Sequence, residues 1–192
     1  MSAENNAAAI MAAEGPKLAR LVAEAVAVLQ RPKMRAQDRG DKIIDIAEAI
    51  SRTITPLSPC RNACSHCCHM ATAISGFEAR MIGRYVGREP AKLGRENAAS
   101  DTLQAELVER YTGVACPFLS PAGKCSVYAV RPAACRLHHS VEDSPDNCDI
   151  AAHPGARVAH LNLTAVQASL ASIFIAEDFG DIREFFPQEP LR

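Results

Sequence analysis

The sequence predicts a mainly α protein, a helical bundle around an irregular, cysteine-rich metal-binding centre with at most one small β-hairpin. Apolar residues recur at intervals of three and four on both sides of the middle of the chain, as in amphipathic helices. All 8 cysteines lie in that middle part, and alternating runs typical of strands are few and short. We expect a single domain (1–192), with N-terminal helices (1–59), a cysteine-cluster metal-binding region (60–148) and a C-terminal helix and tail (149–192).

Two helices are expected before the first cysteine. Residues 1–15 are rich in alanine and asparagine without a clear period, and we expect them to form a frayed or weakly helical lead-in. An apolar stripe from Leu18 to Leu29 then predicts a helix with Pro16 in its first turn. A second stripe, from Ile43 to Ile54, predicts another helix, which the following prolines end.

Two capping boxes predict the starts of later helices. Ser75 and Glu78 have the S-x-x-E pattern and open an apolar stripe that runs to about Arg88. Thr164 and Gln167 have the same spacing before a C-terminal stripe. We therefore expect both pairs to close the first turn of a helix.

The remaining segments are expected to be less regular. A stretch opened by Pro90 carries one more helical stripe, from Leu103 to Tyr111. The sequence Ser120-Pro121-Ala122-Gly123 fits a type I turn. The tail from Glu177 to Arg192 is charged and holds two prolines, so we expect it to be a solvated end.

Composition excludes several classes of function. The formal net charge is −1, aromatic residues make up 5% and tryptophan is absent, which disfavours nucleic-acid binding. No apolar run approaches the roughly 18 residues of a membrane span. The first residues carry an acid and no apolar segment follows, unlike a secretory signal. We expect a cytoplasmic protein that contacts neither nucleic acid nor membrane.

The cysteines point to metal chemistry, because disulfides are rare in a reducing compartment. Thiolates select zinc, copper(I) or iron–sulfur clusters. Structural zinc is typically bound by two C-x2-C pairs, and this chain has only one, Cys64 with Cys67. An iron–sulfur cluster is therefore favoured, with Zn²⁺ as the alternative. The cysteines form two groups of four: Cys60, Cys64, Cys67 and Cys68, then Cys116, Cys125, Cys135 and Cys148.

The short spacing of Cys60, Cys64 and Cys67 predicts that they bind one centre together with a cysteine of the second group. The side chains of Cys67 and Cys68 are expected to diverge, so that one of them serves a second centre or stays unligated. Whether one or two centres form is left open by the spacing.

Four histidines stand near these cysteines: His66, His69, His138 and His139. Each could complete a mixed site. For each one singly, the favoured interpretation is a polar residue that hydrogen-bonds backbone or sulfur near the metal.

At these residues the chain resembles the zinc- or iron-chelating cysteine-cluster family, also called CxxCxxCC or YkgJ-type. The resemblance covers about residues 60–148 and rests on three motifs besides the first cysteine group. They are Cys116-Pro117-Phe118-Leu119, Gly123-Lys124-Cys125-Ser126-Val127-Tyr128 and Arg131-Pro132-Ala133-Ala134-Cys135-Arg136, with Cys148 as the last cysteine.

The resemblance implies that all eight cysteines bind metal. A related module accompanies methyl transfer with an iron–sulfur cluster in flagellin lysine N-methylases. This chain departs from the family pattern in having three residues between Cys60 and Cys64 and His138-His139 after Cys135-Arg136-Leu137.

Two motif arginines could offset the negative charge of the thiolates. The alternative is that they are surface residues in weak ion pairs. For Arg131 the surface interpretation is favoured, and for Arg136 both stay open.

Two functions remain. The first is an iron–sulfur protein, with a [4Fe-4S] cluster as the expected form, that acts in redox chemistry or supports an enzyme through an unidentified redox or protein partner. The second is a zinc-binding structural or interaction module without catalysis. A radical S-adenosylmethionine enzyme shares the spacing of the first three cysteines, but the chain lacks the βα units of that fold. No catalytic residue is singled out.

Overall fold

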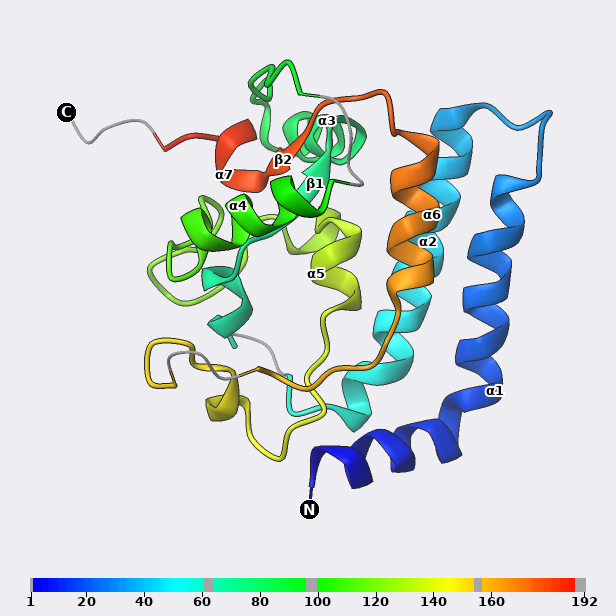
Figure 1. The fold of residues 1–192 in the computed structure, drawn as a ribbon, viewed down its shortest axis with the longest axis vertical. Helices are drawn as coiled ribbons and strands as arrows, with labels where there is room; N and C mark the ends of the chain where they lie inside the picture. Colours follow the sequence, from blue (N-terminus) through cyan, green and yellow to red (C-terminus); the bar gives the residue numbers. More distant parts are fainter. Residues whose placement is uncertain (1, 61–63, 96–99, 154–156, 189–192) are drawn as a thin grey trace.

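The computed structural model describes residues 2–60, 64–95, 100–153 and 157–188. Over these residues it contains seven α-helices and one two-stranded sheet, so the prediction of a mainly α protein is confirmed (Figure 1). The elements in chain order are α1 (Ala3–Leu29), α2 (Ala36–Ile54), β1 (Ala73–Ser75), α3 (Gly76–Val86), α4 (Asp101–Tyr111), α5 (Ala133–Leu137), α6 (Thr164–Ile173), β2 (Phe179–Asp181) and α7 (Ile182–Phe185).

Helix α1 is longer than expected. It begins at Ala3, and the side chain of Ser2 accepts a hydrogen bond from the backbone N–H of Asn5, at 3.3 Å. Of the frayed or weakly helical lead-in that we expected, the helical alternative is the one observed, and the expectation of Pro16 in the first turn is wrong because Pro16 lies inside the helix. An interior proline removes one backbone hydrogen bond and displaces the preceding turn. Figure 1 accordingly shows α1 bending between its first turns and the remainder.

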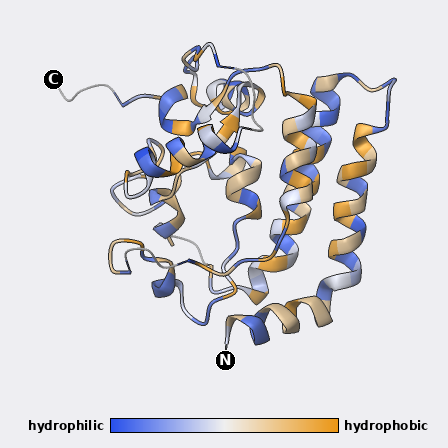
Figure 2. Ribbon diagram, viewed as in Figure 1, coloured by the Kyte–Doolittle hydropathy of each residue, from blue (hydrophilic) through white to orange (hydrophobic). Residues whose placement is uncertain are grey.

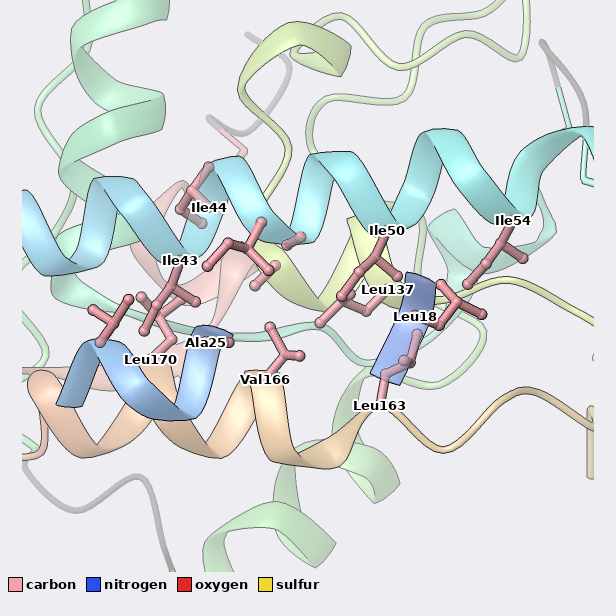
Figure 3. Close-up of a cluster of buried hydrophobic side chains, with 14 of the residues drawn as sticks. Leu18, Ala25, Ile43, Ile44, Ile50, Ile54, Leu137, Leu163, Val166 and Leu170 are labelled. Atoms are coloured by element: carbon pink, nitrogen blue, oxygen red, sulfur yellow. The ribbon is translucent and has the colours of Figure 1, made fainter. Parts of the chain in front are cut away.

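Helices α1, α2 and α6 enclose the larger hydrophobic core. The stripe predicted for α2 is confirmed, with Ile43, Ile50 and Ile54 fully buried. Figure 3 shows these side chains on one face of α2, with Ile43 near Leu170 of α6, Ile50 near Leu137, and Ile54 near Leu18 and Leu163. Hydrophilic and hydrophobic residues alternate along the helices, so each helix presents one apolar face to its neighbours (Figure 2).

The helix starts agree with the sequence in one case and not in the other. Ser75 and Glu78 form the predicted capping box at α3. At α6, Thr164 is already helical and Leu163 stands at the cap position without a side-chain hydrogen bond, so that prediction is wrong. The side chain of Asn162 instead accepts from the N–H of Thr164, at 3.2 Å.

Helix α4 carries the stripe predicted from Leu103 to Tyr111, although of that stripe only Leu107 is buried. Residues 96–99, in the stretch expected to open at Pro90, lie outside the described residues. The predicted turn at residues 120–123 is closed by a hydrogen bond from Gly123 N–H to the Ser120 carbonyl, at 2.9 Å.

The C-terminal segment is not a solvated end, and that expectation is wrong for the described residues up to 188. Strand β2 pairs antiparallel with β1, with Ile74 opposite Gly180. Phe185 and Phe186 of the α7 region are buried with Ile82 in a second hydrophobic cluster. The segment therefore covers one side of the cysteine-rich region.

No helix in the described parts of the chain combines the length and the apolar composition needed to cross a bilayer.

Candidate metal centre

Cysteines from both sequence groups meet at one cavity of about 130 Å³. Apolar side chains, including those of Val127 and Ile182, form part of its wall. No three metal-binding side chains among the described residues already stand at the spacing of a single-ion site. The thiols thus surround a space and do not converge on one point. The cysteines that line it are Cys60, Cys64, Cys67, Cys68, Cys116, Cys125 and Cys135.

The adjacent cysteines lie on a short 3-10 helix, His66–His69. The backbone turns tightly there, since the N–H of Cys68 donates to the Ser65 carbonyl at 2.9 Å. The Cys68 thiol lies close enough to that of Cys67 to raise its pKa, and both side chains line the cavity. The expectation that these two side chains diverge is therefore wrong, because the tight turn lets both reach the same space.

Ser140 joins the first and the last cysteine of the chain. Its backbone N–H donates to the Sγ of Cys60 at 3.4 Å. Its hydroxyl lies near the thiol of Cys148 and lowers the pKa of that thiol in opposition to burial; Cys148 ends another 3-10 helix, Pro145–Cys148. Ser140 is itself fully buried, so it holds these thiols in fixed positions. Residues 61–63, between Cys60 and Cys64, lie outside the described residues.

The other three cysteines come from a turn and a helix. The N–H of Leu119 donates to the Cys116 carbonyl at 3.0 Å, which closes the turn at the Cys-Pro motif. Leu119 in turn forms an isolated antiparallel bridge with Cys125. Cys135 lies in α5, a helix that packs against α2. The tertiary structure thus brings together thiols that are far apart in the sequence.

Burial raises the pKa of the thiols of Cys116, Cys125, Cys135 and Cys148. The pKa of Cys67 is raised first by the hydrogen bond with Cys68 and then by burial. Neighbouring thiols add to several of these shifts, because two thiolates close together repel. Without a cation these thiols hold their protons, and a bound cation would favour the thiolate form.

Arg131 lies against this cavity. Its side chain is 12% exposed, and its guanidinium stacks 4.0 Å from the ring centroid of Tyr128. Its charge lowers the pKa of the thiols of Cys67, Cys125 and Cys135, in opposition to burial. The surface interpretation of Arg131 is therefore wrong.

Arg136 is also buried, with 5% of its side chain exposed. It pairs with Glu48 of α2 and donates to the carbonyls of Arg131 and Ala129, at 2.7 and 2.9 Å. The partner carboxylate balances its charge. Arg136 therefore fixes the segment that carries Arg131 onto α2 and α5.

The four histidines divide into two pairs. His138 and His139 line the thiol cavity, and burial lowers the pKa of both, that of His139 to about 4. His139 also shares a hydrogen bond of 3.0 Å between its Nε2 and the hydroxyl of Ser51. His66 and His69 instead line a separate cavity of about 750 Å³. The donor set at the thiol cavity is therefore seven thiols with two neutral imidazoles at its edge.

Sequence reasoning missed the C-terminal contribution to this region. Asp181 and Arg183 are buried, and Arg183 donates to the carbonyl of Cys68 at 3.1 Å. The sequence carries a signal for this segment. Asp181 and Glu184 form a capping box, and the apolar pair Phe185-Phe186 follows it directly.

Comparison with known families gives one match. Residues 59–153 match the model of the CxxCxxCC family, described as a putative zinc- or iron-chelating domain. The matched range contains all eight cysteines. It does not include α1, α2, α6, β2 or α7. Neither a curated protein nor a solved structure matches the chain.

Proposed function

We propose that residues 59–153, which match the model of the CxxCxxCC zinc- or iron-chelating domain, hold an iron–sulfur cluster, in the [4Fe-4S] form, for redox chemistry or in support of an enzyme. A cluster of this kind supplies a one-electron redox couple to a partner protein or an associated reaction centre.

One observation carries the proposal. A single zinc ion needs its four ligands about 2.3 Å away, which draws the sulfurs closely together. Here seven cysteines surround a cavity of about 130 Å³, roughly ten times the 10–15 Å³ that one water molecule requires. A polynuclear cluster suits a space of that size better than one ion does.

The surroundings suit a charged cluster. Val127 and Ile182 limit the access of water, which tunes the potential of a buried cluster. Arg131 contributes a positive charge beside the thiols, which offsets part of the negative charge of a thiolate-bound cluster.

Two ligand sets follow from proximity. We assign Cys60, Cys64, Cys67 and Cys148 to the first set, since Ser140 joins Cys60 to Cys148 and the Cys148 thiol is influenced by the other three. Cys68, Cys116, Cys125 and Cys135 also line the cavity and are available to a second centre, which would adjoin the first because the Cys67 thiol acts on those of Cys68, Cys125 and Cys135.

The alternative, a zinc-binding structural module, is favoured by His138 and His139 at the cavity, because mixed cysteine and histidine sites are typical of zinc. Anaerobic purification followed by iron, zinc and sulfide analysis separates the two. A brown protein with matching iron and sulfide that dithionite bleaches supports the cluster. A colourless protein with stoichiometric zinc identifies the alternative, and a protein without metal contradicts both.

Replacement of each cysteine by serine tests the ligand sets. The variants of Cys60, Cys64, Cys67 and Cys148 should lose metal together, while those of Cys68, Cys116, Cys125 and Cys135 should alter only a second centre. Full and equal metal content in the Cys60, Cys64 and Cys67 variants would show the first set to be wrong.

A further inference from the structure

Arg183 of α7 lies outside the matched range and contacts the backbone on which two cavity cysteines stand. Its side chain is 7% exposed. Its guanidinium donates hydrogen bonds to carbonyl groups of two separate segments. Three of these bonds are 3.1–3.3 Å long, and the bond to Val114 is shorter. The accepting carbonyls are those of Cys68 and Met70 in one segment and of Val114 and Ala115 in the other.

The two segments are also joined to each other directly. The N–H of Cys116 donates to the Cys68 carbonyl at 2.8 Å, and the N–H of Gly113 donates to the His69 carbonyl at 2.7 Å. The Cys68 carbonyl thus accepts from both Cys116 and Arg183. Neither segment belongs to a sheet among the described residues, so these few bonds set their separation.

Asp181 fixes the position of the Arg183 side chain. Asp181 is fully buried, and its Oδ1 accepts from the Nη1 of Arg183 at 2.8 Å. Its Oδ2 accepts from the N–H of Thr72 at 2.6 Å, which ties the pair to β1. A planar guanidinium with five donors can serve several carbonyls at once, whereas a lysine cannot reproduce that fork.

We propose that Arg183 is a positioning residue of the metal centre, which holds Cys68 and Cys116 at the separation that lets both thiols face the same cavity. The inference rests on the proposed function in one respect, that Cys68 and Cys116 supply metal ligands. It also makes the C-terminal segment a functional part of the centre, although the chelating domain ends before it.

Alkylation of individual cysteines tests the proposal in the full chain. The metal-loaded protein is treated briefly with iodoacetamide, and mass spectrometry measures the modification rate at each thiol. In Arg183→Gln we expect Cys68 and Cys116 to react about 10-fold faster or more, with lower metal content, by analogy with the usual loss on removal of an outer-shell partner. Cys60 and Cys148, which Ser140 holds, should react at the wild-type rate.

Arg80→Gln is the matched control. Arg80 pairs with Glu177 at 2.7 Å, just before β2, and that ion pair is exposed and touches neither cysteine segment. The control should leave all eight rates unchanged. A uniform rise at all cysteines in Arg183→Gln, or no rise at Cys68 and Cys116, with a native circular dichroism spectrum would overturn the proposal.

Two further arms keep the test decisive. If Arg183→Gln fails to fold because Asp181 is left as an unpaired buried charge, Arg183→Lys retains the charge without the fork. Selective exposure of Cys68 and Cys116 in the lysine variant supports the proposal, and wild-type protection in it overturns the proposal. The same measurement on protein reconstituted with zinc separates the two hypotheses, because the contacts of Arg183 with the two segments do not depend on which metal the thiols bind.

Discussion

At the scale of residues, five thiols at the candidate centre have raised pKa values. Burial or a neighbouring thiol raises the pKa of Cys67, Cys116, Cys125, Cys135 and Cys148. Arg131 partly opposes this at Cys67, Cys125 and Cys135, and Arg183 does so at Cys116. A metal-free fold therefore keeps these groups protonated at neutral pH, and uptake of a metal must release protons.

This state predicts how stability depends on pH. An unfolded cysteine titrates near about 8.5, below the raised values of the folded state, so the unfolded chain loses its protons first as the pH rises. The free energy of unfolding of the metal-free protein should fall above about pH 8, by up to about 1.4 kcal/mol per pH unit for each raised thiol. Urea denaturation under reducing conditions with a chelator, between pH 7 and 9.5, measures the decline.

Two controls accompany this prediction. Cys135→Ser removes one raised thiol and should make the decline shallower. The metal-loaded protein should not show the decline, because coordinated thiols are already deprotonated. A metal-free stability that is constant or increases over this range would contradict the assignment of raised values.

At the scale of elements, the position of α2 depends on the close approach of Gly40 to two aromatic rings. Gly40 of α2 faces a pair of stacked rings, Phe77 and Phe174, whose centroids are 4.3 Å apart. A Cβ at Gly40 would lie 2.7 Å from atoms of Phe174 and 2.8 Å from Phe77. The absence of a side chain therefore allows α2 to pack against both α3 and the end of α6.

We expect Gly40→Ala to destabilise the protein by about 1–3 kcal/mol through overpacking, although alanine is the better helix former by about 1 kcal/mol. Gly15→Ala is the matched substitution in α1. Its new Cβ would meet only the flexible end of Met11, at 3.3 Å, so we expect no loss and up to about 1 kcal/mol of gain. Denaturant midpoints with unchanged m-values measure both, and equal effects of the two substitutions would refute the packing argument.

At the scale of the whole molecule, the two hydrophobic clusters differ in their relation to the thiols. The larger cluster is built by α1, α2, α5 and α6, away from most of the cysteine loops. The smaller one includes Phe118 and Val127, and Cys116 and Cys125 pack against it. Loops with so little core of their own depend on the metal for their structure.

Metal removal should therefore loosen residues 60–75 and 113–150 while much of the helical structure remains. Structural thiolate sites can contribute on the order of 10 kcal/mol, comparable to the whole stability of a domain. Hydrogen exchange with and without a strong chelator locates the change, and circular dichroism follows the helices. Unchanged exchange over residues 113–150 after complete metal loss would show that the scaffold is folded without the centre.

The sequence by itself determined the helical class, the stripe of α2 and the capping box at Ser75, because these depend on local periodicity and spacing. The cysteine motifs likewise sufficed to identify the resemblance to a zinc- or iron-chelating domain, which the family match over residues 59–153 supports. It did not determine how far α1 extends through Pro16, since a proline inside a helix is tolerated only when the remaining contacts compensate. The start of α6 at Thr164 likewise depended on a neighbouring Asn162 and not on the expected box.

Only the tertiary structure decided which side chains meet at the centre. Cys60 and Cys148 are joined by Ser140, Arg131 is withdrawn from the surface, and Arg183 reaches back from the chain's end to the carbonyl of Cys68. None of these contacts has a period or a fixed spacing, because each depends on segments that are distant in sequence. They form only when the β1–β2 pairing and the packing of α5 on α2 bring those segments together.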